Sequence, residues 1–185
     1  MLISGDYICN VPVANGEIKA IPERDILKIC VLHRYQPRGT HTTALVRGFG
    51  FQNGALAGSI GQDSQNIVVV GTNDEDMAVA VNEVIRVGGG VVFAADHTVK
   101  GLIALPMGGI MNPNAYPDEL LTEFERFNAQ TKQYGGKFDN PAFPLSLMLT
   151  CACIPELKIT NRALVDALSG KPVSLFVEEA FENKS

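Results

Sequence analysis

The sequence predicts an α+β domain, in which an antiparallel or mixed β-sheet carries helices packed on one face. Three observations predict this class. Residues 26–70 are rich in the β-branched and aliphatic runs that are typical of strands. Stretches 72–87 and 117–134 place apolar residues at helical spacing. Between them, residues 91–105 alternate around a turn as a hairpin does, and this order differs from the regular strand–helix alternation of a doubly wound parallel sheet.

Length and composition are those of one globular domain. The chain has 185 residues, of which 46% are apolar and 19% charged, so it can bury a sizeable core. We expect residues 1–22 to form an N-terminal arm or hairpin, because Asn15-Gly16 is a turn signal and Pro22 interrupts the chain after it. Residues 23–185 are expected to form the domain itself.

Charge and hydropathy argue against nucleic acid and membranes as partners. The net charge is −5 and the 15 basic residues are scattered, whereas nucleic-acid binding needs clustered Lys and Arg. No apolar run reaches the ~18 residues that a membrane span requires. The N-terminus lacks the basic segment of a signal peptide. The four cysteines form no Cys-x-x-Cys pair, and we expect them to be reduced thiols of a cytoplasmic protein.

Four strands are expected in the first half of the domain, over residues 26–33, 42–47, 55–60 and 66–70. The segment Ile67 to Val70 is apolar at every position, so its strand is expected to be central and buried on both faces. A helix follows it. Thr72-x-x-Glu75 has the form of a capping box, and Gly88-Gly89-Gly90 ends the helix.

The second half begins with a hairpin of two strands, 91–95 and 99–105, around Asp96-His97-Thr98. A long helix comes next. Pro117 suits its first position, where a missing N–H costs nothing, and Gly135-Gly136 ends it. The sheet is thus expected to gain a hairpin and a second covering helix.

The C-terminal part, from residue 138 to 160, is apolar and interrupted by prolines. It contains Cys151 and Cys153, which would share a face if they lay on a strand. Metal binding by this pair would need two further ligands nearby, so we interpret both as buried structural thiols. Beyond it we expect a short helix over 161–168 and a last strand over 173–177.

The histidines do not predict a metal site. His33, His41 and His97 are not spaced as ligands on one strand or helix, and no H-x-E or C-x-x-C motif of a zinc deaminase accompanies them. We interpret all three as surface or loop residues. The sequence therefore predicts no metal ligand and no catalytic residue.

The candidate site is a polar loop between two strands that are expected to be buried. It consists of Gln62, Asp63, Ser64, Gln65 and Asn66. Asp, Ser and Asn are good turn formers, so the loop can be purely structural. Binding residues also gather on loops set by a rigid scaffold, so the loop can instead face a ligand or a neighbouring domain. We predict that Gln62, Asp63 and Ser64 line a pocket or contact surface.

Six segments of the chain form a specific set when they are taken together. They are residues 46–50, 53–57, 65–78, 88–90, 105–111 and 154–160. In this order they resemble the C-terminal domain of bacterial and archaeal adenine deaminases, which belong to the amidohydrolase superfamily. The resemblance covers about residues 23 to 168, which is most of the chain.

The resemblance implies an accessory part of a hydrolase that converts adenine and water to hypoxanthine and ammonia. In the family, an upstream (β/α)8 barrel holds a pair of divalent metals, Mn or Fe, which activate water. Nothing in this sequence supplies that metal set. The resemblance thus implies an amidohydrolase barrel domain or subunit as partner. We expect the chain alone neither to bind divalent metal tightly nor to deaminate adenine.

The candidate loop departs from the family pattern His-Asp-Ser-His-Asn, because Gln62 and Gln65 stand at the histidine positions. An amide hydrogen-bonds but does not exchange protons near neutral pH or ligate a metal well. Two hypotheses follow: an accessory domain of an adenine-deaminase-like hydrolase, or a stand-alone ligand-binding or protein-interaction module. We also expect the apolar segment 138–155 to cover part of the surface that a barrel would otherwise bury, and self-association as a homo-oligomer to hide the rest.

Overall fold

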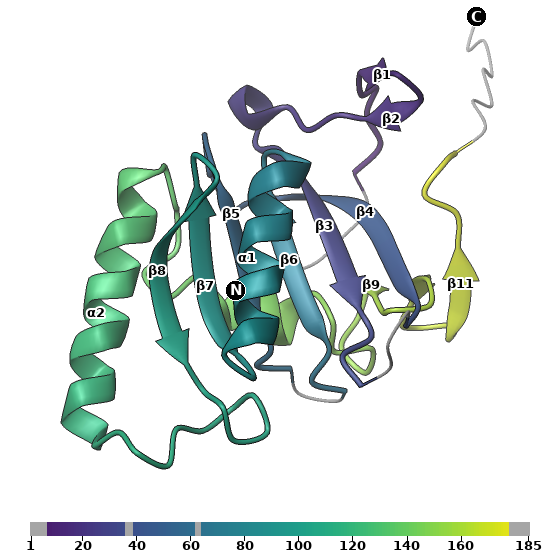
Figure 1. Ribbon diagram of the computed structural model, residues 1–185. Coiled ribbons are helices and arrows are strands. Elements are labelled where there is room, and N and C mark those ends of the chain that lie inside the picture. Colours follow the sequence, from purple (N-terminus) through teal and green to yellow (C-terminus); the bar gives the residue numbers. More distant parts are fainter. Residues whose placement is uncertain (1–6, 36–38, 62–63, 178–185) are drawn as a thin grey trace, which may run out of the picture.

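The computed structural model describes residues 7–35, 39–61 and 64–177, and its main element is a six-stranded sheet (Figure 1). The strand order is β4-β3-β6-β5-β7-β8, and every neighbouring pair is antiparallel. The strands of this sheet are β3 (Ile26–Leu32), β4 (His41–Arg47), β5 (Ala55–Gly58), β6 (Ile67–Gly71), β7 (Gly90–Ala95) and β8 (Thr98–Ala104).

The prediction that Ile67 to Val70 forms a central buried strand is confirmed. This segment is β6, which lies between β3 and β5 and is buried at every position. Successive side chains point to opposite faces of a sheet. Val68 and Val70 therefore join the core on one face, while Ile67 and Val69 join the core on the other.

Helix α1 (Asp74–Arg86) covers one face of the sheet with Met77, Ala80 and other small or aliphatic side chains. Its N-cap is Asn73, whose Oδ1 accepts a hydrogen bond from the Asp76 N–H at 2.7 Å. The capping box predicted at Thr72 is therefore wrong by one position. The Thr72 hydroxyl instead accepts from the Gly54 N–H at 3.0 Å and so ties the end of β6 to the start of β5.

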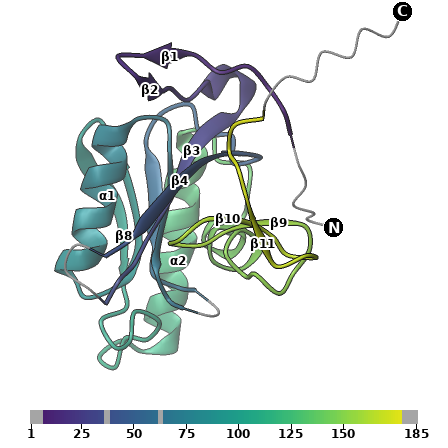
Figure 2. The same ribbon diagram turned by 90° about the vertical axis from the view of Figure 1, so that its right-hand side faces the viewer.

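Helix α2 (Pro117–Gln133) lies on the opposite face, as Figure 2 shows, and it runs beside the edge strand β8 (Figure 1). Its buried Phe127 contacts β8 at Gly101, where an added Cβ would lie 2.9 Å from the ring. The α+β class and the antiparallel sheet are confirmed. The helices, however, are divided between the two faces of the sheet and do not both lie on one face as predicted. No helix in residues 7–35, 39–61 and 64–177 is long and apolar enough to cross a membrane.

The second face also carries the C-terminal part of the chain, which lies beside α2 (Figure 2). The predicted helix over 161–168 is wrong, because the Thr160 Oγ1 accepts N–H bonds from residues 162 and 163 and turns the chain into a strand. The last strand also lies earlier than predicted. The elements of this part are a π-helical turn (Pro144–Met148), β9 (Leu157–Ile159), β10 (Leu164–Asp166) and β11 (Lys171–Val173).

The N-terminal hairpin predicted around Asn15-Gly16 is confirmed, although its strands are short. They are β1 (Val13–Ala14) and β2 (Glu17–Ile18), and both turn residues have positive φ. A 3₁₀ helix (Pro22–Arg24) leads from the hairpin into β3.

Candidate functional site

Loops from distant parts of the sequence meet at one end of the sheet, which is the lower end in Figure 1. β3, β5 and β8 finish there, while β4, β6 and β7 start there, because all neighbours are antiparallel. We call this region the loop end. Its described residues include Arg34, Ser59, residues 64–66, Gly88–Gly90, Gly108, Gly109 and Asn161.

Asn66 is the best-anchored of the described residues of the predicted polar loop. It is buried, and its Oδ1 accepts a hydrogen bond from the Arg34 N–H at 3.2 Å. Its Nδ2 donates to Oδ1 of Asn161 at 3.1 Å, and Asn161 in turn donates to Oγ1 of Thr40 at 2.6 Å. Asn66 therefore joins three segments that are far apart in the sequence. The oxygen and the nitrogen of its side-chain amide are thus both hydrogen-bonded within the domain.

Ser64 and Gln65, the other described residues of the predicted loop, are less buried. Ser64 is exposed, and Gln65 is half-buried with a φ of 50°. The structure thus separates Asn66, which faces inward, from Ser64, which faces outward. Gln62 and Asp63 lie outside the described residues. The prediction that Gln62, Asp63 and Ser64 line a pocket or contact surface stays a prediction.

Arg34 holds two glycine-rich loops together at this end. Its guanidinium donates to the carbonyl oxygen of Gly88 at 2.6 Å and to that of Gly108 at 2.7 Å. The approach is so close that a Cβ on Gly109 would lie 2.0 Å from the guanidinium. Arg34 carries no sequence motif for this role. The one signal is the pair of Gly-Gly segments, whose missing side chains leave room for a long one.

Ser59 supports the same loops from inside the molecule. Its fully buried hydroxyl donates to the carbonyl oxygen of Gly109 at 2.8 Å and accepts from the Gly90 N–H at 2.8 Å. Buried polar groups need such partners, since an unpaired one costs about 1–3 kcal/mol. Ser59, like Arg34, was not among the predicted site residues.

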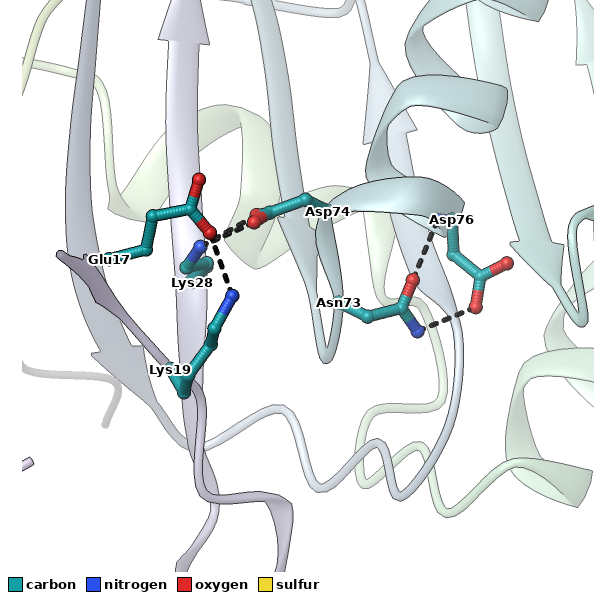
Figure 3. A network of polar contacts seen from close by, with 6 residues as sticks. All are labelled: Glu17, Lys19, Lys28, Asn73, Asp74 and Asp76. Atoms are coloured by element: carbon teal, nitrogen blue, oxygen red, sulfur yellow. Dashed lines mark hydrogen bonds and ion pairs between the residues drawn. The ribbon is translucent and has the colours of Figure 1, made fainter. Parts of the chain in front are cut away.

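A second polar cluster lies at the opposite end of the sheet (Figure 3). Lys28 on β3, whose side chain is 11% exposed, contacts both carboxylate oxygens of Asp74 at 2.7 Å. Asp76 is buried and accepts from the Asn73 amide and from the His97 N–H, each at 2.8 Å. These contacts place acidic groups at the positive end of the α1 dipole. The cluster fixes the start of α1 to the β7–β8 turn, which is a structural role.

The described residues do not fit the metal pair that the resemblance implies. In residues 7–35, 39–61 and 64–177, no group of three or more His, Cys, Asp or Glu side chains is placed to hold a metal ion. His41 and His97 are exposed and His33 is half-buried, in agreement with their interpretation as surface or loop residues.

Asn66 and Ser64 allow the structural part of the loop to be tested. We expect Asn66→Ala to lower the free energy of unfolding by about 1–3 kcal/mol, because the Arg34 N–H and the Asn161 carbonyl lose their partner. The exposed Ser64→Ala serves as the control and should change it by less than about 0.5 kcal/mol. Urea unfolding measures both. Equal losses of unfolding free energy in the two variants would contradict the distinction between buried Asn66 and exposed Ser64.

Comparison with known proteins identifies the family. A family model described as the adenine deaminase C-terminal domain matches residues 2–171. An adenine deaminase of Clostridium botulinum (strain ATCC 19397 / Type A) is 40% identical over 167 residues, which cover 90% of this chain and 28% of that protein. For an adenine deaminase of Dehalococcoides mccartyi (strain CBDB1), the identity is 40% over 161 residues, which cover 87% of this chain and 28% of that protein.

A third relative agrees with these two. An adenine deaminase of Salinibacter ruber (strain DSM 13855 / M31) is 37% identical over 176 residues, which cover 95% of this chain and 32% of that protein. The chain thus spans less than a third of the length of these curated relatives. Since the family model covers nearly all described elements, this chain belongs to the adenine deaminase C-terminal domain family.

Proposed function

We propose that this domain serves an adenine-deaminase-like hydrolase by placing its loop end against a metal-binding (β/α)8 barrel. The region matched in the relatives is their accessory C-terminal domain and not their complete catalytic unit. One observation carries the proposal. Three of the six segments that resemble the family, namely those beginning at residues 88, 105 and 154, lie at or next to the loop end, and a fourth starts there at residue 65 and runs across the sheet.

The chemistry that we propose for the whole enzyme is hydrolysis of adenine to hypoxanthine and ammonia. A pair of divalent metals in the barrel would activate the water. The residues of this chain would act by position. Arg34 and Ser59 hold the glycine-rich loops in shape, and the amides at Gln62 and Gln65 offer hydrogen bonds without proton transfer. Fold alone does not settle function, so the proposal rests on these contacts and on the relatives.

Apolar side chains at the loop end support a covered surface. Met107 is 47% exposed and Met111 is 50% exposed, and Ile110 lies between them. Large apolar side chains that gather in one exposed loop indicate an interaction surface. We propose that the barrel covers them. We also propose that the enzyme is a cytoplasmic homo-oligomer, in which partly exposed Phe143 is buried between subunits. The curated relatives favour an accessory domain of a larger hydrolase over a stand-alone binding module.

A domain exchange tests the proposed function. The Clostridium botulinum relative would be prepared without its C-terminal domain and again with the present chain in its place, and ammonia release from adenine would be measured. We expect the exchange protein to release ammonia at least about tenfold faster than the truncated enzyme. Correct positioning of reacting groups contributes rate factors of this size or more. The present chain alone is the control and should release no ammonia at an enzyme-like rate.

The result that would contradict the proposal is equally clear. A folded exchange protein that binds its metals but is no faster than the truncated enzyme would show that this domain does not serve a deaminase barrel. Circular dichroism and metal analysis of both proteins establish folding and metal content. Turnover by the isolated chain would also contradict the assignment of the chemistry to the barrel.

A further inference from the structure

Cys151 and Cys153 lie on a tight turn that brings their sulfur atoms together. The N–H of Ile154 donates to the carbonyl oxygen of Cys151 at 3.1 Å, which closes a turn of four residues. The two Sγ atoms are 3.1 Å apart. A strand would have set the two side chains on one face but farther apart, since alternate residues of a strand are separated by about two rises of 3.3 Å. The turn therefore creates a proximity that the sequence spacing alone does not.

The two thiols differ in their access to solvent. Cys151 is buried, whereas Cys153 is exposed, so the prediction that both are buried thiols is confirmed only for the first. An exposed thiol that is poised next to a second one is the usual arrangement of a redox-sensitive cysteine and its resolving partner. Reagents in solution can reach Cys153 directly. Cys151 is shielded from such reagents, and the sulfur of Cys153 already sits beside it.

A buried lysine interacts electrostatically with Cys151. Lys158 is 1% exposed, and its Nζ donates to the carbonyl oxygens of Pro155 and Leu157 at 3.3 and 3.2 Å. Burial lowers the pKa of Lys158, and the nearby charge of a Cys151 thiolate acts in the opposite direction. The same attraction favours the thiolate of Cys151 when Lys158 is protonated, and the thiolate is the form of cysteine that attacks sulfur.

From this geometry we propose that Cys151 and Cys153 form a reversible dithiol site that peroxide oxidises to a disulfide. The Cys153 thiolate attacks the O–O bond of hydrogen peroxide, which gives a sulfenic acid and hydroxide. The Cys151 thiolate then attacks the Cys153 sulfur and expels a second hydroxide. The two protons lost by the thiols convert both hydroxides to water. The two cysteine thiols thus lose two electrons in total, and these electrons reduce one peroxide to two waters.

The other cysteines lack these features. Cys30 lies on β3 and is half-buried, and burial raises the pKa of its thiol, so its thiolate is disfavoured. Cys9 is half-buried in the segment before the N-terminal hairpin. Oxidation is therefore expected to select the pair at 151 and 153. Cys30 provides a matched control.

The test treats the full chain with hydrogen peroxide, alkylates the remaining thiols and maps the peptides by mass spectrometry. We expect the free thiols to fall from four to two, with a disulfide within the 151–153 peptide and recovery by dithiothreitol. Cys30→Ser should still lose two thiols. Cys153→Ser should leave Cys151 reduced, because its sulfur is buried. Cys151→Ser should hold Cys153 as a sulfenic acid that dimedone traps.

Several results would overturn the proposal. One is oxidation of Cys153 to the sulfinic acid in the unaltered chain without a disulfide. Another is loss of the free Cys151 thiol in the Cys153→Ser variant. A third is that the thiols of Cys151 and Cys153 are lost no faster than the thiol of Cys30. Lys158→Met gives an independent check, since a slower second step should increase the dimedone adduct of Cys153. Circular dichroism of each variant confirms that it is folded, so an unchanged adduct in folded Lys158→Met would remove the lysine from the proposed site.

Discussion

Replacing Phe93 with alanine is expected to lower the free energy of unfolding by about 3–5 kcal/mol, the largest effect of any side-chain truncation that we propose. Phe93 lies on β7 and is fully buried. Its ring centroid is 5.2 Å from that of Phe51 and 5.1 Å from that of Tyr134. The truncation removes apolar contacts and leaves a cavity between the sheet and the elements on its second face, which a rigid strand cannot collapse to fill.

Urea unfolding of the unaltered protein and of the Phe93→Ala variant measures this difference in the free energy of unfolding. Phe176→Ala is the matched control, because its ring is 73% exposed and its loss should change the free energy of unfolding by less than about 0.5 kcal/mol. A loss below about 1 kcal/mol at Phe93 would mean that the aromatic rings are not packed as the structure places them. The urea concentration at the midpoint of unfolding should fall, while the slope of the free energy of unfolding against urea concentration should change little.

Gly90→Ala should destabilise the domain by at least about 3 kcal/mol, because two costs add. Gly90 has a φ of +144°, which L side chains rarely adopt, and such strain costs about 1–3 kcal/mol. An added Cβ would also lie 2.1 Å from the carbonyl oxygen of Ile103 on the paired strand β8. The start of β7 cannot move away freely, since the Gly90 N–H also bonds to the buried Ser59 hydroxyl.

Gly170→Ala separates the two costs. Gly170 has a φ of +67° but nothing within 4 Å of an added Cβ, so its variant should lose only the strain of about 1–2 kcal/mol. Thermal and urea unfolding compare the two variants. If Gly90→Ala were no worse than Gly170→Ala, the close approach of β7 and β8 at the loop end would be incorrect.

Local sequence patterns predicted the elements whose causes are local. The four apolar residues of β6 predicted a central strand, since only a strand covered on both faces buries them all. The Asn15-Gly16 turn follows from two residues that accept positive φ. By contrast, the face on which α2 packs depends on Phe127 meeting Gly101 across a distance in sequence. No local pattern contains that contact.

The candidate site was predicted only in part, because several of its contacts join residues that are far apart in the sequence. Asn66 was named from its polar loop, and the structure gives it a firm role at the loop end. Arg34 and Ser59, which hold the glycine-rich loops at this end, were not predicted, because they bind main-chain carbonyls of distant glycines. A main-chain acceptor leaves no trace in side-chain composition. The same holds for the Cys151 and Cys153 pair, whose proximity depends on a turn.

The clamp that Arg34 makes on Gly88 and Gly108 has a consequence for how the sequence of this surface can vary. Its acceptors are main-chain carbonyl oxygens, which every residue type carries. Replacing a neighbouring side chain therefore removes no partner of the guanidinium. The two loops can thus change the groups that they present while one side chain keeps their spacing fixed.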